Sequence, residues 1–348
     1  MKMKLLIATG DEAYAKLLSD NISRYHSDIM DVSDCSTWEG FNEAVLTTNF
    51  NVALIDATLM EHAPVKQIHL PILLWTENEN INEYPEAYER INKHQRVSSI
   101  VAKILELYAK VSKNNCEAIS KQTNITAVWS PAGGVGKTSV AIAYALSHAP
   151  QDSMSEKKDV FYLNLEDFSS IPAYFNQKGK GISTVFEMLE SPEGNVEMLI
   201  KGIKNKEKNI NFLSGPDNYD DMCILSGDNV HELVSNCAKL ADELIIDLPC
   251  ACDPKVRKVF EMCSRIFIVT DGSSAAEFKI MQFMSQNSIY ESVKEKITII
   301  TNKDSKTVDY NLEAVIALPY VQSGNAFSIC TTLSENIMKE LSNHDRAV

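Results

Sequence analysis

The stretch that decides the fold is Ser130-Pro131-Ala132-Gly133-Gly134-Val135-Gly136-Lys137-Thr138-Ser139. Apolar residues 125–129 precede it and predict a buried strand, and the apolar run that begins at Val140 predicts a helix. A strand, a glycine-rich loop, Lys-Thr and a helix follow one another in this order in phosphate-binding loops. Glycines let backbone N–H groups surround phosphate oxygens, and the start of the helix adds unpaired N–H groups.

This loop predicts both nucleotide contacts and a metal contact. We expect the Lys137 side chain to reach the β- and γ-phosphates and the Thr138 hydroxyl to bind Mg²⁺. A glycine-rich turn without a ligand is the alternative, and the flanking strand and helix disfavour it. The predicted nucleotide-binding residues of the loop are Gly133, Gly134, Val135, Gly136, Lys137, Thr138 and Ser139.

The loop departs from the usual G-x-x-x-x-G-K-[ST] pattern, because Pro131 stands at the first glycine. It resembles instead the deviant Walker loop, K-G-G-x-x-G-K-[ST], of the MinD/ParA/Mrp family of ATPases. The family's first lysine, which crosses to the partner's nucleotide in the dimer, is Ala132 here. The resemblance implies ATP, Mg²⁺ and a homodimer. The departure implies weak hydrolysis, since a comparable cation, the arginine finger, contributes about 10³–10⁵ in rate.

Two further strand ends carry acidic residues that the resemblance assigns to the site. Residues 243–249 predict a buried strand with Asp247 near its end, similar to the Walker B element, which implies Mg²⁺ held through a water molecule. The strand expected at 160–166 ends in Asn164-Leu165-Glu166, where the family has D-x-D. Glu166 is therefore the candidate for positioning the attacking water. Asn164 cannot take a proton, so it could only orient that water. For both residues, a strand that runs into a polar turn is the alternative.

The C-terminal part predicts contacts to the base of the nucleotide. The resemblance implies that Asn302 and the segment after Pro319 lie beside the adenine. Lys303 is a candidate for supplying the missing cation. We expect the amphipathic helix at 332–341 to pack on the core rather than on a membrane, because its acidic residues nearly cancel the basic ones.

The first 112 residues alternate strand and helix patterns about five times, which predicts a doubly wound parallel sheet. This region resembles a response-regulator receiver domain. In that resemblance Asp56 matches the phosphoacceptor, Thr76 the switch hydroxyl, and Lys93 the lysine that pairs with the phosphoryl group. All three are expected at the carboxyl ends of the strands, where open α/β sheets have their sites.

One part of a receiver is missing, because Thr9 and Gly10 stand where receivers carry an acidic pair for Mg²⁺. Loss of two carboxylates weakens a hard-cation site, and phosphoryl transfer to Asp56 would lose its charge neutraliser. We therefore predict a pseudo-receiver that serves docking or dimerisation. The alternatives are an active receiver and a role of Asp56 as a strand-end cap without chemistry.

Length and composition set the broader limits. A chain of 348 residues is long enough for two domains, which we expect at 1–112 and 125–348, with a linker at 113–124. A net charge of −14 disfavours non-specific binding of nucleic acid. Eight scattered cysteines without C-x-x-C predict reduced thiols and disfavour a metal site. With no long apolar run, the expected location is the cytoplasm or the inner face of the membrane.

Together these patterns predict an α/β protein with two doubly wound parallel-sheet domains. The architecture is similar to the CpaE-like pilus-assembly ATPase family. That similarity implies an ATP-binding, slowly hydrolysing, dimerising switch or localisation protein, which could serve pilus or secretion assembly. Two alternatives stay open: a nucleotide-binding scaffold without turnover, and a phospho-signalling protein whose active receiver at Asp56 gates the ATPase.

Overall fold

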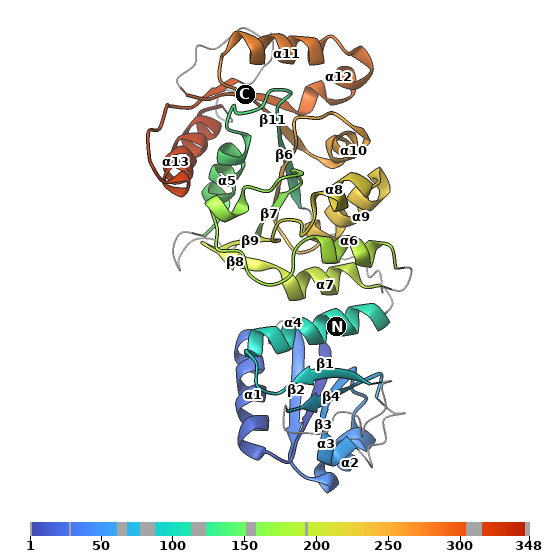
Figure 1. Cartoon of the computed structure of the whole chain (residues 1–348). Coiled ribbons are helices and arrows are strands. Elements are labelled where there is room, and N and C mark those ends of the chain that lie inside the picture. The colour runs from blue at the N-terminus through green and yellow to red at the C-terminus, as the bar shows by residue number, and fades with distance from the viewer. Residues whose placement is uncertain are drawn as a thin grey trace. The chain divides into compact units, whose positions relative to one another are not determined.

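The computed structural model describes residues 2–27, 29–60, 68–76, 88–112, 123–150, 158–191, 194–303 and 315–344. The chain divides into two compact units (Figure 1). The first unit comprises Met1–Asn114 and Glu193–Gly202, and the second comprises Asn115–Pro192 and Ile203–Val348. The linker expected at 113–124 lies almost wholly outside the described residues.

The first unit is built on a five-stranded parallel sheet in the order β2-β1-β3-β4-β5. Its strands are β1 (Met3–Ala8), β2 (Met30–Cys35), β3 (Val52–Asp56), β4 (Leu70–Trp75) and β5 (Glu89–Asn92). Helices α1 (Glu12–Tyr25) and α4 (Val97–Val111) cover one face, and α2 (Trp38–Thr47) and α3 (Ala57–Met60) cover the other. The predicted parallel α/β sheet is confirmed.

The apolar strands of this unit are buried on both faces. In β1, Leu5 and Ile7 belong to the cluster beneath α1 and α4, whereas Leu6 and Ala8 belong to the cluster beneath α2 and α3. Successive side chains of a strand point to opposite faces, so a sheet covered on both sides needs a continuous apolar run.

The first unit also contains a segment from much later in the sequence, which the sequence analysis did not anticipate. The N–H group of Asn195 donates to the Ala109 carbonyl at 2.7 Å. The helix α7 (Val196–Ile203) follows, and a Cβ atom at Gly202 would lie 2.7 Å from the Cβ atom of Leu105. Glycine at this position therefore allows α7 to approach α4 closely.

The second unit contains an eight-stranded sheet in the order β13-β12-β11-β6-β10-β7-β9-β8. All neighbours are parallel except β8 and β9. The strands are β6 (Asn124–Trp129), β7 (Val160–Asn164), β8 (Asn205–Glu207), β9 (Ile210–Phe212), β10 (Glu243–Asp247), β11 (Arg265–Thr270), β12 (Ile297–Thr301) and β13 (Val315–Ala317).

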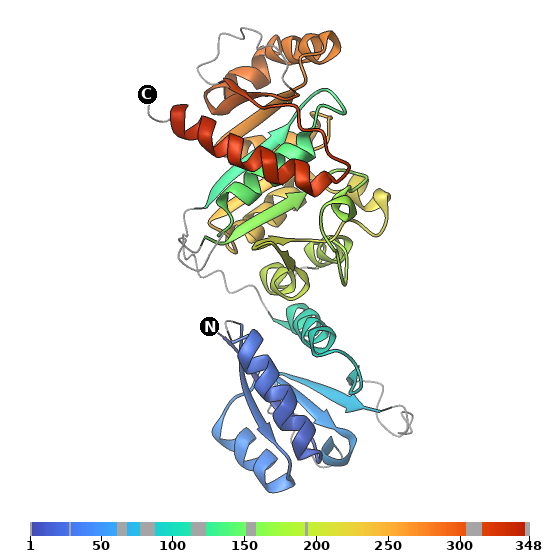
Figure 2. The ribbon, with the colours of Figure 1, turned by 90° about the vertical axis from the view of Figure 1, so that its left-hand side faces the viewer.

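Helices cover both faces of this sheet, with α5 and α13 on one side and α9 and α10 on the other (Figures 1 and 2). Strand β8 and helices α8, α10 and α12 are not predicted by the sequence pattern, and α13 begins at Ala326, earlier than the expected Thr332. The helices are α5 (Lys137–His148), α6 (Ser183–Leu189), α8 (Tyr219–Ile224), α9 (Gly227–Ala238), α10 (Pro254–Met262), α11 (Ser274–Met284), α12 (Asn287–Val293) and α13 (Ala326–His344).

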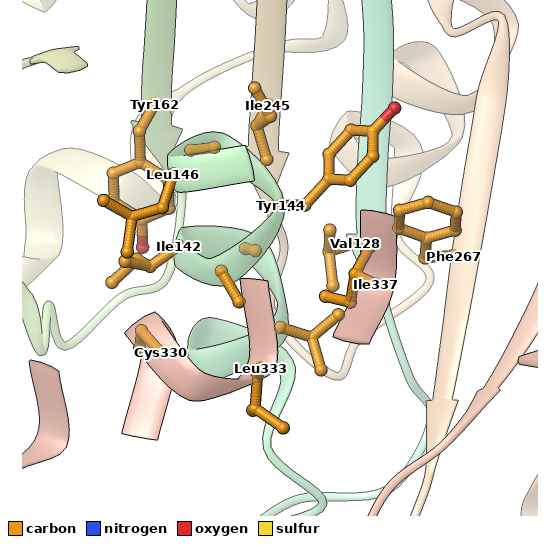
Figure 3. Packing of buried hydrophobic residues seen from close by; sticks show 14 of the residues in the cluster. Val128, Ile142, Tyr144, Leu146, Tyr162, Ile245, Phe267, Cys330, Leu333 and Ile337 are labelled. Atoms are coloured by element: carbon orange, nitrogen blue, oxygen red, sulfur yellow. The ribbon is translucent and has the colours of Figure 1, made fainter. Parts of the chain in front are cut away.

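The contact between α5 and α13 lies in an apolar cluster of this unit (Figure 3). Leu333 and Ile337 of α13 are 1% and 0% exposed, so the expectation that this amphipathic helix packs on the core is confirmed. Within the described residues, no helix is long and apolar enough to span a bilayer. The labelled members of the cluster are Val128, Ile142, Tyr144, Leu146, Tyr162, Ile245, Phe267, Cys330, Leu333 and Ile337.

Candidate nucleotide-binding site

The glycine-rich loop joins the end of β6 to the start of α5. Gly134 and Gly136 have φ angles of +74° and +101°, a backbone region that side chains other than glycine rarely adopt. The Asn302 side-chain amide donates to the Val135 carbonyl at 2.9 Å, and a Cβ atom at Gly136 would overlap that amide. Gly136 is therefore required both by its backbone conformation and by the close approach of Asn302.

The Lys137 ammonium group is held between two side chains. Its Nζ atom lies 3.3 Å from Glu166 Oε1 and 3.4 Å from Cys250 Sγ. Burial opposes the charge on Lys137, but Glu166, Cys250 and Asp247 together outweigh burial and raise the pKa of Lys137 above its ordinary value. The Thr138 hydroxyl donates to Glu166 Oε2 at 3.5 Å. Glu166 thus contacts both side chains that the loop is predicted to offer to nucleotide and metal.

Asp247, at the end of β10, is completely buried. The neighbouring strand β7 places Asn164 opposite it in register. Its Oδ2 atom accepts hydrogen bonds from Tyr162 Oη at 2.9 Å and from Asn164 Nδ2 at 3.1 Å. Its Oδ1 atom has no hydrogen-bond partner among the described residues. Burial, together with the nearby Glu166 carboxylate, raises the pKa of Asp247 to about 7.

The residues at this point fit a magnesium ion. Mg²⁺ prefers oxygen ligands and completes its coordination with water and phosphate, so one carboxylate and one hydroxyl from the protein suffice. Asp247 offers an oxygen that no described residue hydrogen-bonds, and Thr138 offers its hydroxyl. The described residues contain no group of three or more His, Cys, Asp or Glu side chains that could form an all-protein metal site.

A cavity of about 320 Å³ adjoins the other side of the loop. The predicted base contacts Asn302 and Pro319 both line it, as does Ser139. Lys303 lines it too, and its Nζ atom donates to the Gly134 carbonyl at 3.1 Å and lies 3.5 Å from Asp271 Oδ2. Lys303 is therefore a cation that is hydrogen-bonded to the loop itself.

Sequence reasoning missed three side chains of this site. Tyr162 shares a strand face with Asn164, because the period of a strand is two, and this spacing is a signal that could have found it. Tyr174 Oη lies 3.2 Å from Ser139 Oγ, and Cys250 contacts Lys137. No local sequence pattern predicts the contacts of Tyr174 and Cys250 with the loop, because the tertiary fold brings both residues to it.

In the first unit, the Asp56 carboxylate is satisfied by the protein itself. Its Oδ2 atom accepts from Thr9 Oγ1 at 2.8 Å and from the Gly10 N–H group at 3.1 Å. Its Oδ1 atom accepts from the Thr58 N–H group at 2.9 Å and from Thr58 Oγ1 at 2.6 Å. Burial opposes ionisation, but these hydrogen bonds outweigh it and lower the pKa of Asp56.

The other predicted receiver residues lie at the same edge of this sheet. Lys93 Nζ donates to Thr9 Oγ1 at 3.1 Å and lies 3.7 Å from Asp11 Oδ2. Because Thr9 Oγ1 in turn donates to Asp56, the Thr9 hydroxyl connects Lys93 with the Asp56 carboxylate. Asp11 caps the start of α1, and Thr76 directly follows β4. Thr9 thus stands between the lysine and the carboxylate, at a position where receivers carry an acid.

Comparisons with known proteins bear on the fold. A ParA family ATPase from Chlorobium tepidum TLS matches with a TM-score of 0.51 and 17% identity, covering 63% of this chain and 98% of that chain. MinD from Pyrococcus horikoshii OT3 complexed with Mg-ADP gives a TM-score of 0.44 at 14% identity, covering 64% and 98%. No family model and no curated protein matches the sequence.

Sequence identities this low indicate a shared fold and do not indicate a shared function. The chain therefore contains a fold similar to that of the ParA family ATPase, and the position of the glycine-rich loop assigns that fold to the second unit. The receiver and CpaE-like resemblances stay predictions.

The raised pKa of Asp247 predicts a pH-dependent effect of Asp247→Asn on stability. The folded wild type holds a proton up to about pH 7, whereas an unfolded aspartate releases it near pH 3.8. Wild-type stability should therefore fall between those values, so the stability of the variant relative to the wild type should rise by about 2–4 kcal/mol between pH 5 and pH 8. Urea unfolding without metal or nucleotide, at pH 5 and pH 8, measures this difference. The same change at exposed Asp228 is the control, and an equal difference at both pH values would contradict the burial argument.

The four hydrogen bonds to Asp56 predict that Asp56→Asn destabilises the first unit by about 1–3 kcal/mol at pH 7, because the amide NH₂ group must face protein donors. The loss should shrink as the pH falls below about 4, because the lowered pKa of the wild-type carboxyl stabilises the fold only while it is ionised. Thermal unfolding measures both effects, with exposed Asp20→Asn as the control. Labelling of the wild type at Asp56 by acetyl phosphate would instead favour an active receiver.

Proposed function

We propose that the protein is an ATP-binding switch of the MinD/ParA type that hydrolyses ATP slowly in the presence of Mg²⁺. One observation carries this proposal: Lys137, Thr138 and Asp247 converge at the end of a glycine loop, while a cavity lies at the loop's other side. These are the groups that phosphoryl transfer needs, since its catalysis consists largely of positioning and charge neutralisation.

The residues of the chain divide the work as follows. Backbone N–H groups of the loop and Lys137 bind the phosphates, and Asn302 and Pro319 enclose the base end. Tyr162 and Asn164 hold Asp247 in place through its Oδ2 atom, which leaves Oδ1 for the hydration shell of the metal. Bound Mg²⁺ supplies charge neutralisation on the transferring phosphoryl group.

Glu166 has a second task in this proposal. Without nucleotide its carboxylate neutralises Lys137, which is only 7% exposed, and so prevents an uncompensated buried charge. When the phosphates of the nucleotide bind Lys137, the ion pair between Lys137 and Glu166 breaks, and the Glu166 carboxylate can orient the attacking water. The same carboxylate thus holds the empty site together and acts in the filled one.

Two features support slow turnover. Ala132 carries no charge and is only 5% exposed, so the cation that the resembled family places here has no counterpart at this position. Lys137 must also leave Glu166 before it can bind phosphate. Lys303, which already contacts the loop, is the cation on this chain that we propose compensates in part.

The wider role is proposed from resemblance alone. A homodimer, with the first unit as a docking domain without phosphoryl chemistry, would serve pilus assembly, secretion or positioning. A scaffold that binds ATP without turnover is the competing hypothesis, and measured hydrolysis separates the two.

The first test is ATP binding and turnover by the full chain with Mg²⁺. We expect clear binding with slow turnover, and Lys137→Ala should abolish both, because the phosphates lose their cation. Ala132→Lys should raise the rate if the missing cation limits catalysis. Ala132→Met is its matched control, because methionine places a similar unbranched chain at this buried position without charge. Absence of ATP binding by the wild type would refute the proposal, and binding without turnover would favour the scaffold.

Glu166→Gln should separate binding from catalysis. The variant should bind ATP about 3–10-fold more tightly, because an amide competes less strongly than a carboxylate for Lys137, and it should hydrolyse ATP more slowly. Isothermal titration and single-turnover hydrolysis measure the two effects, with exposed Glu187→Gln as the control. An unchanged Kd would show that Glu166 does not compete with nucleotide.

A further inference from the structure

A second cavity, of about 540 Å³, lies beside the glycine loop and takes no part in the proposed hydrolysis. Pro131, at the start of the loop, forms one border, and Cys250 and Cys252, after β10, form another. Side chains from α10, α11 and α12 complete it, among them Arg257 and Lys279. All of these residues belong to the second unit.

The charge of this cavity differs from that of the chain as a whole. The chain carries a net charge of −14, yet the described residues that line the cavity include two cations and no carboxylate. The Arg257 Nε atom donates to the Cys252 carbonyl at 3.1 Å, which fixes the guanidinium group at the border. The nearby acid Asp253 lies 3.7 Å from the Lys255 ammonium group, so its charge is partly neutralised. A pocket with these groups favours an anion.

One wall of the cavity is apolar and held in place. The rings of Trp129 and Phe283 lie 4.8 Å apart, and the Trp129 indole N–H group donates to the Ala251 carbonyl at 3.0 Å. Ile289 adds an aliphatic side chain, and Gln282 and Gln286 add amide groups. Small-molecule sites commonly combine an apolar wall with a few charged or polar groups that fix orientation.

We propose that this cavity binds a small organic anion, with an apolar body beside Phe283 and Ile289 and a carboxylate near Arg257 and Lys279. The ligand would communicate with the nucleotide site through Cys250. Cys250 lines the cavity, and its Sγ atom accepts a hydrogen bond from Lys137 Nζ at 3.4 Å. A ligand that displaces Cys250 therefore changes the surroundings of the loop lysine.

Benzoate and its uncharged analogue benzamide provide the probe, and the cysteines provide the readout. Iodoacetamide alkylates free thiols, and peptide mass spectrometry gives a separate rate for Cys252 in the cavity and for exposed Cys223 outside it. Benzoate at tens of millimolar should slow alkylation of Cys252 by about threefold or more, since a ligand of this size binds with a Kd of about 1–10 mM. Benzamide should have little effect, and neither compound should protect Cys223.

Charge variants make the test specific. Arg257→Gln/Lys279→Gln should lose the protection by benzoate, whereas Arg257→Lys/Lys279→Arg should retain it. Lys206→Gln/Lys339→Gln removes two charges outside the cavity and should behave as the wild type. Equal protection by benzamide, or no protection by benzoate in the folded wild type, would overturn the proposal. The assay contains no nucleotide, so its result is independent of ATP binding.

Discussion

The second unit is organised around a carboxylate in the protein interior, where an ionised carboxylate lowers the stability of the fold. Asp247 ends the central strand β10 and is completely buried, with one oxygen bound by Tyr162 and Asn164 and the other without a hydrogen-bond partner in the described part of the chain. An incompletely paired charge in the interior destabilises a fold, and the proton retained up to about pH 7 is the expected response. A divalent cation in place of that proton would remove the penalty. In the function that we propose, metal binding would therefore be linked to the stability of the sheet.

The first unit meets the same constraint in a different way. Asp56 also ends a buried parallel strand, but all of its oxygens accept hydrogen bonds from Thr9, Gly10 and Thr58. A carboxylate with satisfied oxygens is a structural cap, and a carboxylate with an open oxygen can serve as a ligand. The two carboxylates thus lie at equivalent strand ends of similar sheets. They differ in whether the neighbouring residues leave a carboxylate oxygen open to a ligand. This contrast supports the hypothesis that chemistry resides in the second unit.

The features that could be predicted from sequence are the local ones. Glycines with positive φ, apolar strands and the Lys-Thr pair mark the loop because each depends on a few adjacent residues. The short polar strand β8 carries no alternating apolar pattern, and it was missed for that reason. The ion pair between Lys137 and Glu166 and the contact of Cys250 with Lys137 depend on strand register and loop course, which no local pattern encodes. Asn302 and Pro319 line one cavity, and their contacts to the base stay predictions from resemblance.

The assignment of residues 193–202 to the first unit has a consequence for how the protein can be divided. The chain enters the second unit, returns to the first through α7, and then enters the second again at Ile203. A cut in the segment 113–124 would leave α7 on the C-terminal fragment, without the Ala109 carbonyl and the Leu105 side chain that it contacts. The two units are thus joined by three passages of the main chain, and neither is complete as a single continuous stretch of sequence.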